Sequence, residues 1–598
     1  MHPSILNFRP RKVEHSFSVG ISATLLYQCA IFLVAVLAFV PAFDNQFVHW
    51  DDQYYVTENI LVNQPTWQHL GQLWTKVVSL NYHPLTMLTL WLNSYVWGVQ
   101  SATPFIITNV VLHALTSTLV FAFCHQLTKR DHYIAMTAAL LFAIHPMHVE
   151  SVAWVSERKD VLYAFFYFLS LSAYLKYLDG KSARWWWVAL ITFVGACLSK
   201  AMAVSLVPCL VLIDWYRGQR WLSKSMLIGK IPFAFIGLLT GSIAVDVQSG
   251  GDFFGLLVNT NIDAALVSST EPDIWSQMVS TGYALWFYLS SFVMPVGMSP
   301  FHPYEADISS WYLVVLPLLV VVWLGSYKLH RTVFFGFSLF MAAIVLVLPW
   351  VGVGSAIAAD RYTYIPYVGL AMVVGVAVRK LEERLGSGLV ASTVIMVAGL
   401  LLYRTRMQAD IWQDHATLFS QAVERYPDDS KSRVLLSAGL YTAGEYEQSV
   451  YHLEHAINQL GLHDSDAFEK LATSYSELGE EGKALAFYNY SIKLDSLNYV
   501  ARYHRGLLVM DTDPQQAITD FDVCESSDFE FMTQYVHSPR AVCYGRLGRY
   551  EEAIADFTAA IDLGHDVEVN LRDRAMTYDL LGMPEEAAAD RQRLADMQ

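Results

Sequence analysis

The sequence predicts an all-α protein with two parts, a membrane half with many spanning helices and a C-terminal superhelix of helical repeats. Three observations support this prediction. Long apolar runs recur up to about Tyr403 and then stop, charge rises beyond Gln408, and a period of about 34 residues begins near Asp429. The length of 598 residues also exceeds one ordinary domain. We therefore expect a polytopic membrane domain over residues 1–407 and a repeat domain over residues 408–598.

Twelve apolar runs make up the membrane half. Several are shorter than the ~20 residues that a helix needs to cross a bilayer, so they must use polar flanks to complete a span. The run Tyr283–Val296 is aromatic and contains Pro295, and we expect it to be interfacial or re-entrant. About eleven crossings then remain. The runs are Val19–Phe43, Pro104–Phe123, Tyr133–Val149, Val161–Tyr177, Trp185–Leu198, Ala201–Trp215, Ile231–Val245, Tyr283–Val296, Trp311–Leu324, Val333–Trp350, Ile365–Val378 and Leu389–Tyr403.

Basic residues set the expected orientation, because Lys and Arg concentrate on the cytoplasmic side of a membrane. Arg9, Arg11 and Lys12 predict a cytoplasmic N-terminus. With eleven crossings the repeat tail lies on the outer face, whereas twelve crossings would return it to the cytoplasm. Further Lys and Arg fall in loops 129–130, 181–184, 217–230, 328–331 and 379–380, which we expect inside. The loops expected outside are 44–102, which is the first outer loop, then 145–160 and 246–273.

The tail repeats two series of small residues at a spacing of 33 to 36. The segments Leu547–Ala553 and Leu581–Ala587 are near copies, with Gly at the turn. This pattern resembles the tetratricopeptide repeat, in which small residues let paired helices approach closely. About five such pairs would stack into a superhelix with a concave binding surface. The series are Ser449, Ala484, Ala517, Ala553 and Ala587, and Ala438, Ala472, Gly506, Ala541 and Ala575.

The charge balance argues against nucleic acid as a partner. The net charge is −16, and most of it belongs to the tail. No basic stripe is present to meet phosphates. We expect a membrane-integral protein that binds no nucleic acid.

A pair of acids, Asp51 and Asp52, follows the first apolar run directly. Two carboxylates so close to a membrane surface are costly unless water or a polar partner receives them. An enzyme that acts on a lipid-borne substrate needs an acid at this depth. Alternatively, the pair caps the first turn of a surface helix, because Asp is a favoured N-cap residue.

The other outer loops add histidines, acids and cations on the same predicted side. His145 and His148 stand three residues apart beside Glu150, a spacing that suits a metal ligand pair. Pro146 lies between them and breaks regular helix, so hydrogen bonds to a phosphate or to neighbouring acids are the favoured role. The remaining candidates are His83, Arg158, Lys159, Arg361 and Tyr364.

Each of these motifs also has a purely structural interpretation. Glu157–Asp160 would form a solvated turn with internal ion pairs. Arg361 would serve as an interfacial anchor. Lys200, which stands between two short apolar runs, would simply mark the outer surface.

Taken together, these motifs resemble the transmembrane and tetratricopeptide repeat-containing proteins, relatives of the protein O-mannosyltransferases in the GT-C superfamily. The likeness rests on the acid pair, His-Pro-x-His-x-Glu, Glu-Arg-Lys-Asp, Asp-Arg-Tyr-x-Tyr-x-Pro and the C-terminal repeats, and it covers nearly the whole chain. The compact membrane half and five repeats suggest a bacterial or archaeal relative, with a bacterial inner membrane as the expected location.

The resemblance implies a membrane domain of GT-C type and an inverting transfer from a polyprenyl-phosphate sugar to Ser or Thr hydroxyls of an acceptor protein held by the repeats. It implies that Asp51 is the general base and that Asp52 orients the acceptor or exchanges roles with it. No cofactor is certain, and participation of a divalent cation stays open. The implied donor-phosphate ligands are Arg158, Lys159, Arg361, His145 and His148, and the implied acceptor or pocket residues are Glu150, His83 and Tyr364.

Two alternatives belong to different functional classes. In the first, the chain is a non-catalytic membrane-anchored scaffold whose repeats recruit other proteins. Such a scaffold has no reason to gather acids, histidines and arginines in outer loops. In the second, a GT-C transferase modifies a lipid or a glycan instead of a protein.

Overall fold

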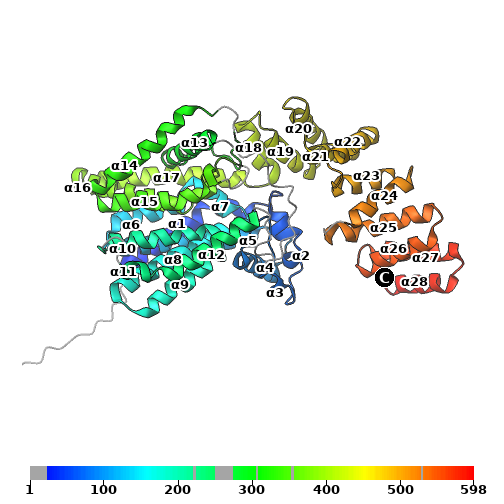
Figure 1. Cartoon of the computed structure of the whole chain (residues 1–598), viewed down its shortest axis with the longest axis horizontal. Coiled ribbons are helices and arrows are strands. Elements are labelled where there is room, and N and C mark those ends of the chain that lie inside the picture. Colours follow the sequence, from blue (N-terminus) through cyan, green and yellow to red (C-terminus); the bar gives the residue numbers. More distant parts are fainter. Residues whose placement is uncertain are drawn as a thin grey trace, which may run out of the picture.

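The structure is a computed structural model that describes residues 23–219, 224–248, 274–304, 308–351, 356–526 and 530–597. Over these ranges the chain is helical, and it contains no β-strand beyond two isolated bridges. A helical bundle lies beside an arc of paired helices (Figure 1). The predicted all-α fold is therefore confirmed. Arg9, Arg11, Lys12 and most of loop 246–273 lie outside the described residues.

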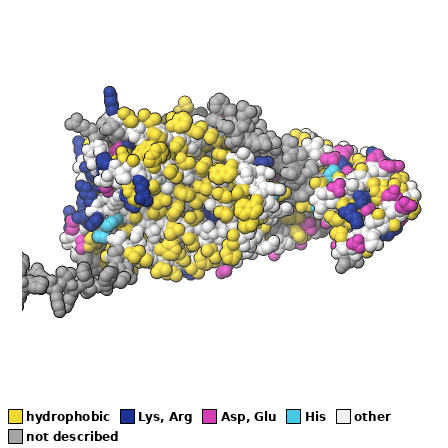
Figure 2. Space-filling model, turned by 90° about the horizontal axis from the view of Figure 1, so that it is seen from below, with side chains coloured by type: hydrophobic (Ala, Val, Ile, Leu, Met, Phe, Trp, Pro, Cys, Tyr) yellow, Lys and Arg dark blue, Asp and Glu magenta, His cyan; other side chains and the backbone are white. Residues whose placement is uncertain are grey.

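The bundle contains a helix at each of the twelve apolar runs. The last of them continues past the expected domain boundary at residue 407 and ends at Ile411. The helices are α1 (Ala23–Ala38), α5 (Thr103–Leu127), α6 (His132–Ile144), α8 (Arg158–Gly180), α9 (Ala183–Cys197), α10 (Leu206–Tyr216), α12 (Ile231–Gln248), α13 (Ile274–Val293), α14 (Val315–Leu329), α15 (Arg331–Ile344), α16 (Pro366–Leu385) and α17 (Ser387–Ile411). Apolar side chains cover the middle of this bundle, and Lys and Arg gather at the end away from the repeats (Figure 2).

Among the residues that the structure describes, five stretches are long and apolar enough to cross a membrane, namely α5, α8, α12, α14 with the turn before it, and α17. A bent pair, α6 and the segment Pro146–Ala153, makes a sixth if it is one span. Four further apolar helices are shorter, in line with the short runs of the sequence. The number of crossings stays a prediction.

The bend after α6 sets the position of the later site. His145 is extended, and Pro146 opens the short 3-10 turn η3 (Pro146–His148), since proline lacks the N–H that would continue the α-helix. The chain turns by 58° and continues as α7 (Val149–Ala153). The acids and cations of loop 145–160 therefore lie at the end of the bundle where α8 begins.

The first outer loop and the repeat tail meet at one end of the bundle. The side-chain amide of Asn45 donates to the carbonyl of Ala409 (3.2 Å), and the backbone N–H of Gln46 donates to the carbonyl of Gln413 (2.8 Å). A separate hydrogen bond within the bundle, which does not involve the tail, joins Arg217, just after α10, to the carbonyl of Gln126 in α5 (3.1 Å). The tail therefore starts on the same side as the acid pair. The loop's elements are η1 (Val40–Asp44), η2 (Gln53–Thr57), α2 (Ile60–Asn63), α3 (His69–Gln72) and α4 (Pro84–Trp97).

The tail contains five helix pairs, as the period predicts. Small residues lie where the helices touch, and a Cβ added to Gly506 would come within 2.7 Å of the Phe521 ring. One helix, α18 (His415–Arg425), precedes the pairs and packs against the first of them. The pairs are α19 (Ser430–Thr442) with α20 (Tyr446–Asn458), α21 (Ser465–Glu477) with α22 (Glu481–Leu494), α23 (Tyr499–Val509) with α24 (Pro514–Glu525), α25 (Glu530–Arg546) with α26 (Tyr550–Asp562), and α27 (Val567–Leu581) with α28 (Pro584–Asp596).

Two glycines make the contact between α15 and α16. A Cβ on Gly336 would collide with the carbonyl oxygen of Gly369, and a Cβ on Gly369 would collide with the carbonyl oxygen of Gly336. Backbone atoms cannot move aside as a flexible side chain can. The close approach of these helices therefore requires glycine at both positions.

We predict that Gly369→Ala lowers the free energy of unfolding by about 1–3 kcal/mol, because the added methyl group forces the two helices apart. The measurement is the thermal midpoint of the purified protein in detergent. Gly399→Ala in α17 is the matched control, since nothing lies within 4 Å of its Cβ position. Equal midpoints for the two variants would contradict the prediction.

Candidate active site

Asp52 ties the first outer loop to the loop between α7 and α8. Its side chain is 1% exposed. One carboxylate oxygen accepts from the backbone N–H of Val48 (2.8 Å), and the other accepts from the backbone N–H (2.9 Å) and the hydroxyl of Ser156. Asp52 stands at the start of η2, but its side chain does not cap that helix. The capping alternative is therefore not what the structure shows.

Asp51 has a different environment, although it is the next residue along the chain. It is partly exposed, and the Ser79 hydroxyl donates to its carboxylate. Burial raises the pKa of Asp51, and the nearby Lys159 opposes this rise. Burial also raises the pKa of Asp52 to about 7, against the hydrogen bonds from Ser156 and Val48. Burial, more than repulsion between the two acids, thus raises both pKa values.

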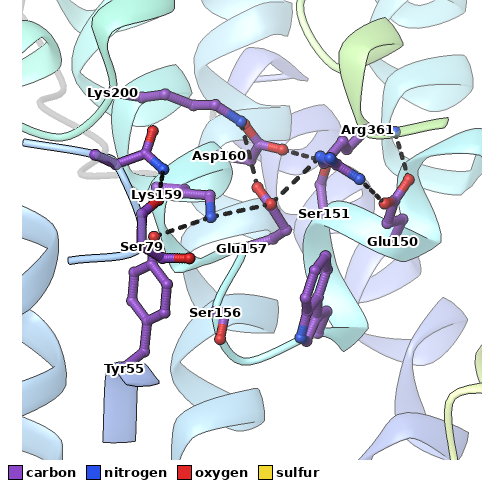
Figure 3. Close-up of polar contacts among 12 residues, drawn as sticks. Tyr55, Ser79, Glu150, Ser151, Ser156, Glu157, Lys159, Asp160, Lys200 and Arg361 are labelled. Atoms are coloured by element: carbon purple, nitrogen blue, oxygen red, sulfur yellow. Dashed lines mark hydrogen bonds and ion pairs between the residues drawn. The ribbon is translucent and has the colours of Figure 1, made fainter. Parts of the chain in front are cut away.

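Glu157 lies at the centre of a buried network of charges. Its carboxylate is 3.2 Å from the Lys159 ammonium and 3.3 Å from the Lys200 ammonium. Lys200 also lies 2.5 Å from Asp160, and Lys159 donates to the Tyr55 hydroxyl (3.3 Å; Figure 3). Burial opposes ionisation of Glu157, but the surrounding cations outweigh it and lower its pKa.

Arg361 joins the same network from the turn η9 (Asp360–Thr363). Its guanidinium forms an ion pair with Glu150 and lies 3.4 Å from a carboxylate oxygen of Glu157. Its backbone N–H donates to the second oxygen of Glu150 (2.8 Å), and the guanidinium lies 5.9 Å from the centre of the Trp154 ring. Arg361 thus faces the other charges, unlike an interfacial anchor. We call Glu150, Glu157, Lys159, Asp160, Lys200 and Arg361 the Glu157 network.

Arg158 does not belong to this network, although the resemblance implied that it binds the donor phosphate with Lys159 and Arg361. The side chain is fully buried, and its guanidinium donates to the carbonyl of Phe105 (2.8 Å) and to the side chain of Asn109, both on α5. Consecutive helical residues point about 100° apart. At the start of α8, Lys159 faces the network and its neighbour Arg158 therefore faces the bundle.

His145, His148 and Tyr364 lie in packing contacts of the bundle and are not members of the Glu157 network, so their phosphate and pocket roles stay predictions. His145 lies 3.2 Å from the carbonyl of Phe292, and its ring stacks on that side chain. His148 lies 2.9 Å from the carbonyl of Phe142. Tyr364 has no exposed surface, and its hydroxyl lies 2.6 Å from a ring nitrogen of His113. All three make polar contacts within the bundle, while Nε2 of His148 has no hydrogen-bond partner among the described residues.

A cavity of about 310 Å³ lies beside the network. Its wall is mostly apolar and comes from α9 and α12, while Lys200 and the segment Leu80–His83 supply polar atoms. His83 is 3% exposed and stacks on Tyr55, and its Nε2 has no hydrogen-bond partner among the described residues. Burial lowers the pKa of His83 to about 3, so its imidazole is neutral. His83 therefore lines this cavity.

Sequence reasoning missed Lys200, Tyr55 and Ser156. The role of Lys200 could have been predicted, because a lone lysine at membrane depth needs an acidic partner. Glu157 and Asp160 were the available acids. Ser156 and Tyr55 gave no such signal. For metals, the described part of the chain has no group of three or more His, Cys, Asp or Glu side chains that could hold an ion.

Comparisons with known proteins agree with this architecture. Residues 82–242 match the family model for dolichyl-phosphate-mannose-protein mannosyltransferase, and residues 540–563 match a tetratricopeptide-repeat model. The human Protein O-mannosyl-transferase TMTC1 is 23% identical over 74% of this chain and 56% of its own length. The expected resemblance to protein O-mannosyl-transferases is confirmed.

Other relatives show the same pattern. Protein O-mannosyl-transferase F38B6.6 of Caenorhabditis elegans is 24% identical over 67% of this chain and 57% of its own length. Human TMTC4 reaches 33% identity, but over 27% of this chain and 25% of its own length. The chain thus spans about half the length of the first two relatives. Among solved structures, MamA from Desulfovibrio magneticus RS-1 aligns with 28% of the chain at 14% identity and a TM-score of 0.26, which is too low to support an argument.

The raised pKa of Asp52 predicts a dependence of stability on pH. The folded pKa of about 7 exceeds the ordinary value of 3.8, so between these values the folded protein holds a proton that the unfolded chain releases. The free energy of unfolding therefore falls as pH rises through this window, by up to about 4 kcal/mol from this group.

We expect Asp52→Asn to weaken this dependence, because the amide does not titrate, while Asp51, whose pKa burial also raises, still contributes. Thermal midpoints in detergent at about pH 5 and about pH 8 measure it. Glu58→Gln, which changes an exposed acid of the same loop, should keep the wild-type slope. If Asp52→Asn shows the same fall in midpoint as the wild type, the assignment is wrong.

Proposed function

We propose that the chain is a membrane glycosyltransferase that transfers a sugar from a polyprenyl phosphate to Ser or Thr hydroxyls of proteins on the outer face. One observation carries this proposal. Asp51, a partly exposed residue, and an apolar cavity flank the same set of cations. A base, a phosphate-binding charge and a place for a hydrocarbon chain are the three components that such a transfer needs. The relatives' names suggest mannose as the first sugar to test.

Asp51 is the better candidate for the general base. A base must come within hydrogen-bond reach of the acceptor hydroxyl. Both oxygens of Asp52 are already occupied by Val48 and Ser156, whereas Asp51 holds the hydroxyl of Ser79, an exposed residue. Its raised pKa also makes it a stronger base. Asp52 then acts by positioning Asp51, instead of exchanging roles with it.

The donor fits the cavity and the cations beside it. A polyprenyl chain is apolar and suits the surfaces of α9 and α12, and its phosphate would lie near Lys200 and the free Nε2 of His83. In the transfer, the acceptor oxygen bonds to the anomeric carbon while its proton moves to Asp51. The bond from that carbon to the phosphate oxygen breaks, so the configuration inverts. Lys159, Lys200 and Arg361 stabilise the charge that develops on the departing polyprenyl phosphate.

The repeats supply a means of holding the acceptor. They begin at the end of the bundle that contains the acid pair, since Asn45 and Gln46 contact Ala409 and Gln413. A tetratricopeptide superhelix offers a concave surface for a peptide or protein. Tethering an acceptor there raises its effective concentration at Asp51.

We predict that Asp51→Asn lowers kcat by at least about 10²-fold, because the amide cannot take the acceptor's proton. The assay follows transfer of sugar from polyprenyl-phosphate mannose to a Ser/Thr peptide by purified protein, with and without a chelator to test a divalent cation. Glu58→Gln is the control for charge loss in the same loop. Full activity of the folded Asp51→Asn protein would refute the role of Asp51, and absence of transfer by the wild type with every polyprenyl-phosphate sugar would refute the function.

The cavity gives a second, independent prediction. Ala244→Trp fills the space beside α12, so the KM for the polyprenyl-phosphate donor should rise at least about tenfold, since the hydrocarbon chain loses its place. Leu238→Trp on the same helix is the matched control. Leu238 is 73% exposed and lies outside the cavity lining. Equal donor KM values for the two variants would show that the cavity does not bind the lipid chain.

A further inference from the structure

A chain of hydrogen bonds runs from the start of the repeat tail to the turn that carries Arg361. Tyr426 follows α18 directly, and its hydroxyl lies 2.8 Å from Nδ1 of His302. The Nε2 of His302 lies 3.2 Å from the Asp360 carboxylate. His302 and Asp360 are 1% and 4% exposed, so water does not compete for these bonds. Donation by the tyrosine hydroxyl to Nδ1 and by the Nε2–H to the carboxylate satisfies all three groups.

The backbone strengthens the same connection. The N–H of Ile357 donates to the carbonyl of His302 (3.0 Å), and Ala358 forms an isolated bridge with His302. The segment from Ile357 to Asp360 is thus held against His302 on two sides. Arg361 is the next residue, and its N–H donates to Glu150. A shift of His302 would therefore move Arg361 relative to Glu150.

The same end of the tail also touches the acid pair. Trp50, which precedes Asp51, stacks on Trp154 with ring centres 4.7 Å apart. Its other neighbour is Phe419 of α18, whose ring meets it edge-on at 5.3 Å. Helix α18 and the residue that follows it therefore support both Trp50 and the Arg361 turn.

We infer that the first helix of the tail is a structural part of the catalytic site, with Tyr426 and His302 as positioning residues for Arg361. The kinetic consequence of this inference rests on the proposed function. The hydrogen-bond chain from Tyr426 through His302 to Asp360 does not depend on that function. Neither residue needs to touch substrate, because each acts through Asp360. The tail is then more than a tethered acceptor holder, since its first helix, α18, helps to set the geometry of the phosphate-binding cations.

The test compares Tyr426→Phe with Lys431→Met in full-length protein. Tyr426→Phe removes one hydroxyl and keeps the ring, so we expect kcat to fall about three- to tenfold, the range for one hydrogen bond, with donor KM unchanged. The ammonium of Lys431 lies 5.0 Å from the centre of the Phe301 ring, next to His302 in the chain, and no bond to Asp360 is described for it. Lys431→Met should keep the wild-type kcat. Equal kcat values for wild type and Tyr426→Phe would overturn the kinetic part of the inference.

Hydrogen exchange gives a measurement that needs no activity. Residues 357–364 should exchange faster in Tyr426→Phe than in wild type or Lys431→Met, because the Asp360 turn is less firmly held. If the wild type transfers no sugar but this difference appears, the proposed function fails and the positioning role stands. Identical exchange in all three proteins would overturn the positioning role, whatever the activity.

Discussion

The site depends on one buried carboxylate, that of Glu157. Burying an ion costs several kcal/mol unless partners compensate for the lost water. Here Lys159, Lys200 and Arg361 come from separate segments of the chain and meet at Glu157. Each cation would be costly to bury alone, and together they would repel one another. The acid makes their convergence favourable in surroundings with little water.

Asp52 is the second buried carboxylate on which the site depends. By accepting from Val48 and Ser156, it joins the first outer loop to the residue just before Glu157. The position of Asp51 relative to the cations is therefore set by its neighbour. Under the proposed function the two adjacent acids have separate tasks, one structural and one chemical, and the difference comes from which hydrogen bonds each has already made.

Periodicity predicted the helices, because an apolar run or a repeat of small residues depends on many positions at once. The twelve runs and the five helix pairs are found where the pattern placed them. Single side chains were harder to predict. Arg158 and Lys159 look equivalent in the sequence, but the phase of α8 turns them to different neighbours, and that phase depends on where the helix begins. His145 and His148 look like ligands, yet one ring nitrogen of each lies beside a carbonyl at a helix end, that of Phe292 or Phe142.

Helix α12 has one further consequence. It buries 17% of its apolar stretch inside the protein, although it forms one wall of the cavity. A ligand with a long hydrocarbon tail could thus pass between the bilayer and the cavity sideways, and its tail would never meet water. The rate of exchange would then depend on the fluidity and thickness of the surrounding lipid, so the membrane itself would help to set the speed of turnover.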